Sequence, residues 1–451
     1  MTVSTTPDAT SPAPHGTESP YASSLRSSAE VVVVGAGLAG LACAKHLSAA
    51  GLDVLVVEAA EAVGGRVRSE TVGGFRVDRG FQLLNPGYPE VLKVLDLDAL
   101  DLQPFDAGVA VHRGGRVSVV RDPRRHPTAV LEALRFPLGT VKEKAALARW
   151  IVKVTSAGEL KGPDSGWSQG LDAAEVHGEL RWSVLEPFLA GVLGEVDGTT
   201  SRRFVDLLVR SFLRATPALP ARGVQAVPDQ LAAGLPAGSV VLGTKVRHIG
   251  FAPRSLVVET VAGGVNCQRI VVATDAHTAA HLVPELRVPD SHGLSTFWFA
   301  APTSPAPESR ERLLHLDGDR SGPVVNSAVV SAVAPGYVVD GTDRRALVSA
   351  QTLGTDTGAE AERRVREQLG RVYGVGTAGW ELVAAHEVPH ALPVVAPPFE
   401  GPQPVDAGDG VFVAGDHREN SSQQGALVSG RRAADAVLSD VFGRSGSRRA
   451  G

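Results

Sequence analysis

Cysteine is nearly absent from the 451-residue chain, which contains only Cys43 and Cys267. Two cysteines so far apart in the sequence exclude a disulfide framework and a cysteine-based zinc cluster. We therefore expect a protein of a reducing compartment, the cytoplasm. The histidines show no metal-binding spacing on a clear helix, so no metal site is predicted. The histidines compared in this way are His126, His177, His386, His390 and His417.

An excess of basic charge is also missing. The chain has 44 Lys and Arg against 49 Asp and Glu, which gives a formal net charge of −5. A broad basic face for a nucleic-acid backbone is therefore not expected, and nucleic acid is not a predicted partner.

Long hydrophobic runs are absent as well. No stretch of about 18 apolar residues predicts a transmembrane helix, and no apolar stretch follows an N-terminal charge as in a secretory signal. Residues 1–28 and 443–451 are predicted to be disordered tails, the first because it has almost no large apolar residue. Residues 129–154 predict a helix broken at Pro137, which either faces solvent or makes a peripheral membrane contact. Oligomeric state is not predicted.

The chain is rich in glycine, with 50 residues, in an otherwise ordinary globular composition of 43% hydrophobic and 21% charged residues. Its length predicts two to three domains. Glycine above the usual ~7% indicates tight turns or backbone brought close to a ligand.

The start of the ordered sequence predicts a βαβ unit. Val31 to Val34 form a short β-branched run, typical of a parallel strand buried on both faces. Residues 38–50 predict a helix of small and apolar residues, and residues 52–57 predict a second buried strand.

Gly35, Gly37 and Gly40 form G-x-G-x-x-G directly after the first strand. In this motif the glycines allow a tight turn, the approach of a pyrophosphate and close packing of helix on strand. Glu58 ends the second strand, where a carboxylate can accept both hydroxyls of an adenosine ribose and would repel a 2′-phosphate. The spacing therefore predicts a dinucleotide site for FAD or NAD rather than NADP.

Residues 31–69 resemble the FAD-binding start of the superfamily of flavin amine oxidases, protoporphyrinogen oxidases and phytoene-type carotenoid desaturases. The extended motif of that superfamily, R-x-G-G-R-x-x-S/T, is present as Gly64, Gly65, Arg66 and Ser69, with Ala62 in place of the first Arg. The resemblance implies that Arg66 faces the diphosphate of FAD.

Later segments are similar to the superfamily in the same order. They are residues 77–83, 222–235, 244–246, 271–275 and 413–430. The resemblance implies FAD contacts at Gly35, Ala36, Gly37, Leu38, Ala39, Gly40, Glu58, Gly65, Arg66, Gly80, Phe81, Gln82, Val246, Gly415, Asp416, Gln424, Gly425 and Ala426.

The expected fold is α/β, or α+β overall. A Rossmann-like FAD-binding domain is assembled from residues 29–92, 222–292 and 395–442, and a mixed sheet-plus-helix substrate domain is interleaved as residues 93–221 and 293–394. Within these, strands are predicted at 240–246, 255–261, 269–273, 293–300, 345–353 and 410–414, and helices at 201–213, 359–371 and 425–442.

The resemblance implies an enzyme that transfers a hydride from a small molecule to flavin N5. Amine oxidases of the superfamily typically carry a Lys on a strand of the substrate domain, but residues 294–299 contain none, and Ser421, Ser422 and Gln423 stand where an aromatic residue is common. This favours dehydrogenation of a CH–CH or ring CH–NH bond in a mainly apolar substrate over oxidation of a CH–NH₂ group. No catalytic residue is assigned, although His417 could act as a local acid or base.

Three alternatives stay open at this point. Amine oxidation is one, and an escort-type binding protein without FAD is a less favoured second. An NAD-dependent dehydrogenase would leave the G-G-R segment and residues 413–416 unexplained. The aromatic residues of the middle block either line an apolar substrate cavity or form a helical core. They are Trp150, Trp182, Phe188, Phe204 and Phe212.

Overall fold

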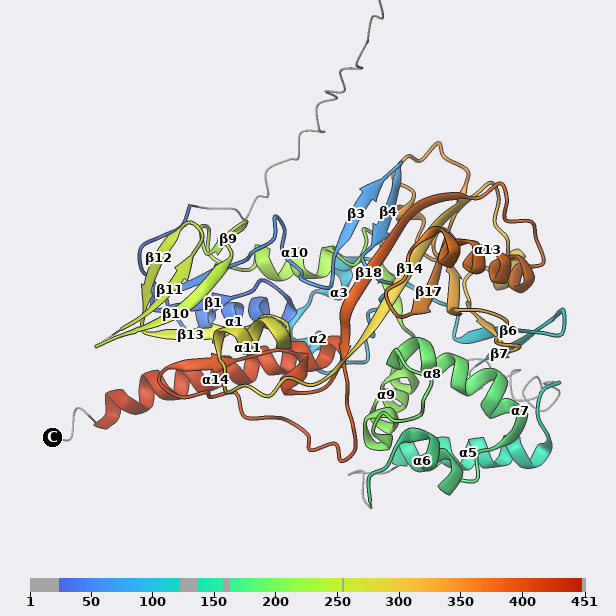
Figure 1. The fold of residues 1–451 in the computed structure, drawn as a ribbon, viewed down its shortest axis with the longest axis horizontal. Helices are drawn as coiled ribbons and strands as arrows, with labels where there is room; N and C mark the ends of the chain where they lie inside the picture. Colours follow the sequence, from blue (N-terminus) through green and yellow to red (C-terminus); the bar gives the residue numbers. More distant parts are fainter. Residues whose placement is uncertain (1–23, 122–136, 157–162, 254, 448–451) are drawn as a thin grey trace, which may run out of the picture.

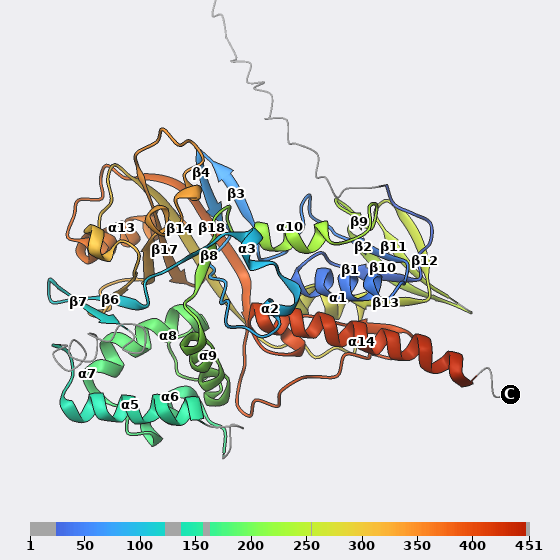
Figure 2. The ribbon, with the colours of Figure 1, turned by 180° about the vertical axis from the view of Figure 1, so that it is seen from behind.

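The computed structural model describes residues 24–121, 137–156, 163–253 and 255–447. Figure 1 shows one half of the molecule around helix α1 (Leu38–Ala49) and another around strand β14 (Ser291–Ala301). A layer of helices lies next to the second half. The turned view in Figure 2 gives the same division.

A five-stranded parallel sheet forms the centre of the first half. Its strands come from three distant parts of the chain, and Val31 lies opposite both Val54 and Arg269. The order across the sheet is β19 (Val411–Val413), β13 (Arg269–Val272), β1 (Val31–Val34), β2 (Val54–Val57) and β9 (Val240–Val241).

Both faces of this sheet are covered, which is why its strands are uniformly apolar. Val31 and Val33 pack toward the helices, and Val32 and Val34 pack toward the opposite layer. The helical layer consists of α1, α10 (Ala226–Ala233) and α14 (Gln423–Ser447). The opposite layer consists of an antiparallel sheet, β10 (Val246–Ala252), β11 (Ser255–Thr260) and β12 (Gly263–Cys267), with α11 (Ala276–Leu282).

Glycine permits backbone-to-backbone packing around α1. A Cβ atom at Gly40 would lie 2.0 Å from the carbonyl oxygen of Gly35, and one at Gly430 of α14 would lie 2.2 Å from that of Ala39. Neither position therefore has room for a side chain. The close contacts seat α1 on the loop after β1 and α14 on α1.

The second half contains a seven-stranded mixed sheet. One of its faces buries Phe297 and Phe299 beneath α13 (Ala359–Tyr373), and the other covers the hairpin of β3 (Ser69–Val72) and β4 (Phe75–Asp78). Its order is β18 (Glu381–Pro393), β14, β17 (Ala346–Leu353), β16 (Val324–Val329), β15 (Leu314–Asp317), β6 (Gly108–Arg113) and β7 (Arg116–Arg121).

Short elements connect these layers. They are α2 (Val91–Val94), α3 (Leu97–Leu100), β5 (Leu102–Pro104), β8 (Ala218–Pro220), α12 (Val330–Val333) and the 3-10 turns η2 (Glu308–Arg310), η3 (Pro335–Tyr337) and η4 (Asp416–Arg418).

The helical layer has an aromatic core of its own. Trp150 and Phe204 are buried in it, and Phe188 meets Phe212 edge to face at 5.5 Å. Trp182 is instead 42% exposed. The middle-block aromatics therefore form a helical core, apart from Trp182. The layer contains α5 (Val141–Ser156), α6 (Trp167–Ala173), α7 (Gly178–Leu180), the π-helical turn η1 (Arg181–Leu185), α8 (Glu186–Leu193) and α9 (Arg202–Arg214).

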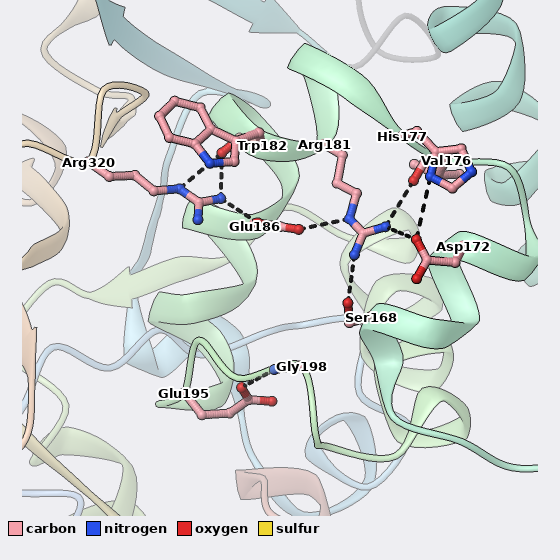
Figure 3. A network of polar contacts seen from close by, with 10 residues as sticks. All are labelled: Ser168, Asp172, Val176, His177, Arg181, Trp182, Glu186, Glu195, Gly198 and Arg320. Atoms are coloured by element: carbon pink, nitrogen blue, oxygen red, sulfur yellow. Dashed lines mark hydrogen bonds and ion pairs between the residues drawn. The ribbon is translucent and has the colours of Figure 1, made fainter.

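A polar network joins this layer to the seven-stranded sheet (Figure 3). Glu186 accepts hydrogen bonds from Arg181 at 2.7 Å and from Arg320, which follows β15, at 2.5 Å. The Arg320 guanidinium also lies over the Trp182 ring, 4.7 Å from its centroid. Arg181 is only 12% exposed and binds Asp172 as well, so it anchors two helices at once.

Most predicted elements are present, but two predictions were wrong. The strand expected at 240–246 is two strands in different sheets, because the chain turns at Gly243, whose φ is +61°. The final helix begins at Gln423 and runs to Ser447, so it includes residues placed in the tail at 443–451. Residues 129–136 of the predicted middle helix lie outside the described residues.

Most of the predicted tail at 1–28 is outside the described residues, but its last part is paired. Ser28 forms a β-bridge with Asn266, and Arg26 binds Asp53 at 2.8 Å. In the part of the chain that the structure describes, no helix is both long and apolar enough to cross a bilayer.

Candidate functional site

The N-terminus of α1 has a glycine cap, as those of α6 and α13 do. Gly37 occupies the N-cap position, so no side chain caps the helix, and no acidic residue lies in the first turn. By contrast, Asp96, Ser201 and Asp275 accept hydrogen bonds as N-caps of α3, α9 and α11. A Cβ at Gly37 would meet nothing within 4 Å. The helix thus offers backbone N–H groups and a positive dipole end to an anion such as a phosphate.

Glu58 lies beside this loop, at the end of β2. One of its carboxylate oxygens accepts from the backbone N–H of Ala36 at 2.7 Å, and the other accepts from that of Ala60 at 2.8 Å. These bonds fix the carboxylate without using all its lone pairs, since an ionised carboxylate has about four acceptor sites. The remaining sites suit the hydroxyl groups of a ribose.

The second glycine loop packs against the first. Gly64 donates from its N–H to the carbonyl of Ala36 at 2.8 Å, and Gly65 adopts φ +58° so close to Gly37 that a Cβ would lie 3.5 Å from the Gly37 Cα. The two loops named by the motif are therefore brought together. A larger residue at Gly65 would narrow the approach to Gly37.

Arg66 makes two contacts across the molecule. Its guanidinium binds Asp416 at 2.7 Å and the carbonyl of Ala391 at 2.8 Å. Although burial lowers the pKa of Arg66, the nearby carboxylate of Asp416 outweighs it and the net pKa is raised. Arg66, the cation expected at the diphosphate, thus binds the C-terminal motif through Asp416. About one third of the Arg66 side chain remains exposed.

The C-terminal motif follows β19. Gly415 adopts φ +153°, and a Cβ there would lie 2.4 Å from the His417 ring. Asp416 is buried against Arg66. Both ring nitrogens of His417 are buried and have no hydrogen-bond partner among the described residues. Burial lowers the pKa of His417 to about 4 despite the carboxylate of Asp416. His417 is therefore neutral at pH 7, which makes it a weak base.

The two glutamines of the predicted site are engaged by the protein. Gln82 donates to the carbonyl of Arg66 at 2.6 Å, which holds the 80–82 segment beside the second glycine loop. Gln424 accepts from the N–H of Glu90 at 2.9 Å. Its side chain thus positions the start of α2 instead of standing free. Val246 begins β10 and pairs with Thr260.

A row of buried polar residues crosses the seven-stranded sheet next to Phe81. Thr296 of β14 lies opposite Gln351 and His386, and its hydroxyl accepts from the N–H of Phe81 at 3.2 Å. Asn326 donates to Gln351 at 3.0 Å. Thr296, an uncharged residue, therefore lies on the strand that would be expected to carry a Lys in an amine oxidase.

Three site features escaped the sequence analysis. Two of them involve β18: the carbonyl of Ala391, and His386, which contacts Glu70 at 2.5 Å. The prolines of this strand, Pro389 and Pro393, argue against a position inside a sheet. The Ala60 N–H is a backbone group that no motif names. Only the edge position of β18 makes its prolines acceptable.

The residues present fit FAD. An uncapped glycine helix end accepts phosphate, a fixed carboxylate accepts ribose, and the Gly80–Gln82 segment and the C-terminal motif approach the same region through Arg66. Within the described ranges, no cluster of His, Cys, Asp or Glu could hold a metal ion. This combination defines a dinucleotide-binding flavoprotein with a second, mixed-sheet half.

A family model described as "Flavin containing amine oxidoreductase" matches residues 38–438, and the chain belongs to this family. Membership confirms the family resemblance, the mixed α/β fold class, the FAD cofactor and the oxidoreductase class predicted from the sequence. The family acts on small molecules, which agrees with the predicted kind of partner.

Individual relatives are similar over short stretches. Putrescine oxidase of Kocuria rosea is 41% identical over 97 residues, covering 22% of this chain and 19% of that protein. Phytoene dehydrogenase of Streptomyces griseus is 43% identical over 91 residues, covering 20% and 16%. The alignments thus span less than a fifth of each of these relatives.

The fold is shared over a much greater length. A wild-type putrescine oxidase structure bound to putrescine superimposes with a TM-score of 0.68 at 18% identity, covering 91% of this chain and 99% of that chain. At such identity the likeness concerns the fold alone.

Proposed function

We propose that the protein is an FAD-dependent oxidoreductase that removes a hydride from a mainly apolar organic molecule, at a CH–CH bond or a ring CH–NH bond. FAD supplies the hydride acceptor, flavin N5. Gly35 to Gly40 would hold the phosphates, Glu58 the adenosine ribose, and Gly80 to Gln82 the flavin region together with Gly415, Asp416, Gly425 and Ala426. Arg66 orients Asp416 for this purpose.

The proposed substrate class rests on one observation, the kind of residue that lines a small cavity. This cavity lies where α8 and α9 meet the ends of β14 and β18. None of the described residues that line it is acidic, and its polar groups are Thr200, His292 and Ser421. Its apolar wall consists of Val192, Leu193, Phe204, Leu392, Pro393 and Val395.

Such a wall suits an apolar body better than an ammonium ion, which requires a carboxylate or aromatic faces to offset the loss of water. The cavity measures about 10 Å³, which is room for a single water. The cavity as it stands is too small for an organic substrate, so binding there requires its lining to open. The polar atoms His292 Nε2 and Ser421 Oγ, both buried and without a partner in the described part of the chain, would then orient the substrate.

The uncharged strand next to Phe81 supports the same choice. Thr296 is 1% exposed and its hydroxyl is used by the Phe81 N–H, so it holds the 80–82 segment in place. Trp298, which lies on the same face as Thr296, is fully buried and donates to the carbonyl of Asp78 at 3.1 Å. These residues hold the 80–82 segment in a dry environment without contributing charge.

The visible spectrum of the purified protein tests the proposal. Anaerobic addition of polyenes, porphyrinogens and primary amines should bleach the flavin band only with one of the first two classes. Bleaching by amines alone would establish the alternative, an amine oxidase. Absence of flavin after FAD is supplied would instead indicate an escort-type binding protein.

A matched pair of glycine variants tests the cofactor site. Gly37→Val should fold but lose nearly all bound flavin, because its side chain would occupy the phosphate approach. Gly376→Val is the control, since Gly376 also has open space around its Cβ position and lies after α13. Equal flavin content in the two variants would refute the proposed phosphate site.

The domain division stays a proposal: residues 29–92, 222–292 and 395–442 form the FAD-binding part, and residues 93–221 and 293–394 the substrate part. Peripheral membrane contact through residues 129–154 also stays a prediction. Limited proteolysis and vesicle flotation address the two separately.

A further inference from the structure

A second cavity is lined by residues of β6, β7, β15 and α13 and of the loop after β14. Figure 1 shows β6 and β7 at the edge of the seven-stranded sheet away from β18 and the cofactor half. The cavity measures about 340 Å³, at the lower end of the range of roughly 300–1,000 Å³ for small-molecule sites. Val117 and the loop Pro305 to Pro307 form an apolar wall. Nothing in the proposed reaction uses this space.

Two histidines form the polar floor of the cavity. The Nε2 atom of His112 lies 2.9 Å from Nδ1 of His315, whose Nε2 lies 3.1 Å from the carbonyl oxygen of Arg310. The His112 ring also faces the Val372 backbone, so three contacts each need a proton: the one to the Arg310 carbonyl, the one between the rings and the one to Val372. Two neutral imidazoles carry only two N–H protons, so one of these contacts lacks its proton.

Arg310 supplies the positive charge of the cavity. No described acidic residue forms an ion pair with its guanidinium, whereas the neighbouring Arg312 binds Asp106. Burial first, and then the charge of Arg310, lower the pKa of His112 to about 4, against the opposing effect of Asp317. Burial, His112 and Arg310 lower that of His315 to about 3. At neutral pH the cavity thus holds one cation and two neutral imidazoles.

We infer that this cavity is a binding site for a small organic anion, with the anionic group on Arg310 and an apolar ring against Pro305 to Pro307 and Tyr373. A planar guanidinium binds a carboxylate through two parallel hydrogen bonds. Tyr373 lines the cavity, with its ring 4.9 Å from that of His315. The site is independent of the proposed redox reaction.

Anion binding should also move a proton. A negative charge next to His112 favours its charged form, and the added proton completes the contact that lacks one in the neutral pair. The anion and Asp317 then balance the two positive charges of Arg310 and His112. Affinity should therefore rise as the pH falls.

Calorimetric titration of the FAD-loaded protein with benzoate, benzamide and inorganic phosphate tests the site. Benzoate should bind at least about tenfold more tightly than neutral benzamide, and Arg310→Gln should weaken benzoate by about tenfold or more. The control Arg116→Gln removes an exposed charge from the same sheet edge and should change binding less than about twofold. Equal benzoate affinity in Arg310→Gln, or tighter phosphate than benzoate, would overturn the inference.

A second titration, with benzenesulfonate, tests the proton because this probe stays charged at both pH values. Its affinity should rise about 2- to 10-fold between about pH 7.5 and pH 5, as expected for an opposite charge that shifts a pKa by one to two units. His112→Asn should lose the rise between the two pH values, whatever its affinity at the higher pH. A flat profile in the unaltered protein would refute proton uptake.

Discussion

Backbone atoms and side chains contribute differently to packing near the two sheets of this protein. Around α1, beside the five-stranded sheet, some contacts are made directly between backbones, as at Gly40 and Gly430. In the seven-stranded sheet, buried side chains such as Thr296, Gln351 and Asn326 make the contacts. A backbone contact excludes every side chain, whereas a side-chain contact can be replaced by another.

This difference separates what binds the common cofactor from what selects the substrate. The helix end, glycines and Glu58 can serve any enzyme that holds FAD in this manner. In the proposed reaction, the groups that a particular substrate would meet are those of the polar row next to Phe81 and of the apolar cavity near Ser421. Substitutions should therefore be tolerated differently in the two halves.

The largest expected effect is that of Gly40→Ala in the cofactor half. The new Cβ would lie 2.0 Å from a backbone oxygen, and neither α1 nor the loop before it can shift alone. We expect a loss of more than about 3 kcal/mol in the free energy of unfolding, measured by denaturant titration. A loss below about 1 kcal/mol would show that the backbone packing is adjustable.

A pH effect of intermediate size is expected from His417, which adjoins Asp416. Its pKa is lowered to about 4 by burial, against about 6.5 in the unfolded chain. A depressed pKa gives stability that is complete above pH 6.5 and is lost as the pH falls toward 4. His417→Leu should reduce this acid-induced loss by about 3 kcal/mol.

Thermal unfolding of both proteins across this pH range provides the measurement. The comparison isolates His417 because His112 and His315 are present in both proteins and add the same acid sensitivity. Parallel profiles for the two proteins would contradict the prediction.

The smallest effect is expected for Gly191→Ala in the substrate half. A Cβ at this position would lie 2.1 Å from Nδ2 of Asn326, which is the end of a side chain and can rotate. Alanine also favours the helix by up to about 1 kcal/mol. Stability should therefore change by less than about 1 kcal/mol, while flavin content stays normal. A loss as large as that in Gly40→Ala would remove the distinction between the two halves.

The cofactor half was largely predictable because its signals are local. Val31 to Val34, the three motif glycines and Glu58 lie within 28 residues, and each requirement is a backbone requirement that only certain residues meet. The hydrogen-bond partners of Arg66 were harder to predict, because Asp416 and Ala391 are more than 300 residues away in the sequence. Whether each predicted residue touches FAD stays a prediction.

The substrate half was harder to predict for a physical reason. Strand β18 contains two prolines, and its pairing with β14 includes irregularities that break simple alternation. The row that joins Thr296 to Gln351 and His386 exists only after three strands have paired. Periodicity in one segment cannot reveal such a row.

The late positions of β19 and α14 in the sequence have a consequence for synthesis of the chain. Strand β19 forms the edge beside β13, and α14 packs on α1, so residues near 39 meet residues near 430. These partners emerge from a ribosome several hundred residues after the glycine loop. The loop after β1 must therefore wait for α14 while the intervening residues are translated. Folding of this half should be slow, because contacts between distant residues must overcome a large loss of chain entropy before they stabilise anything.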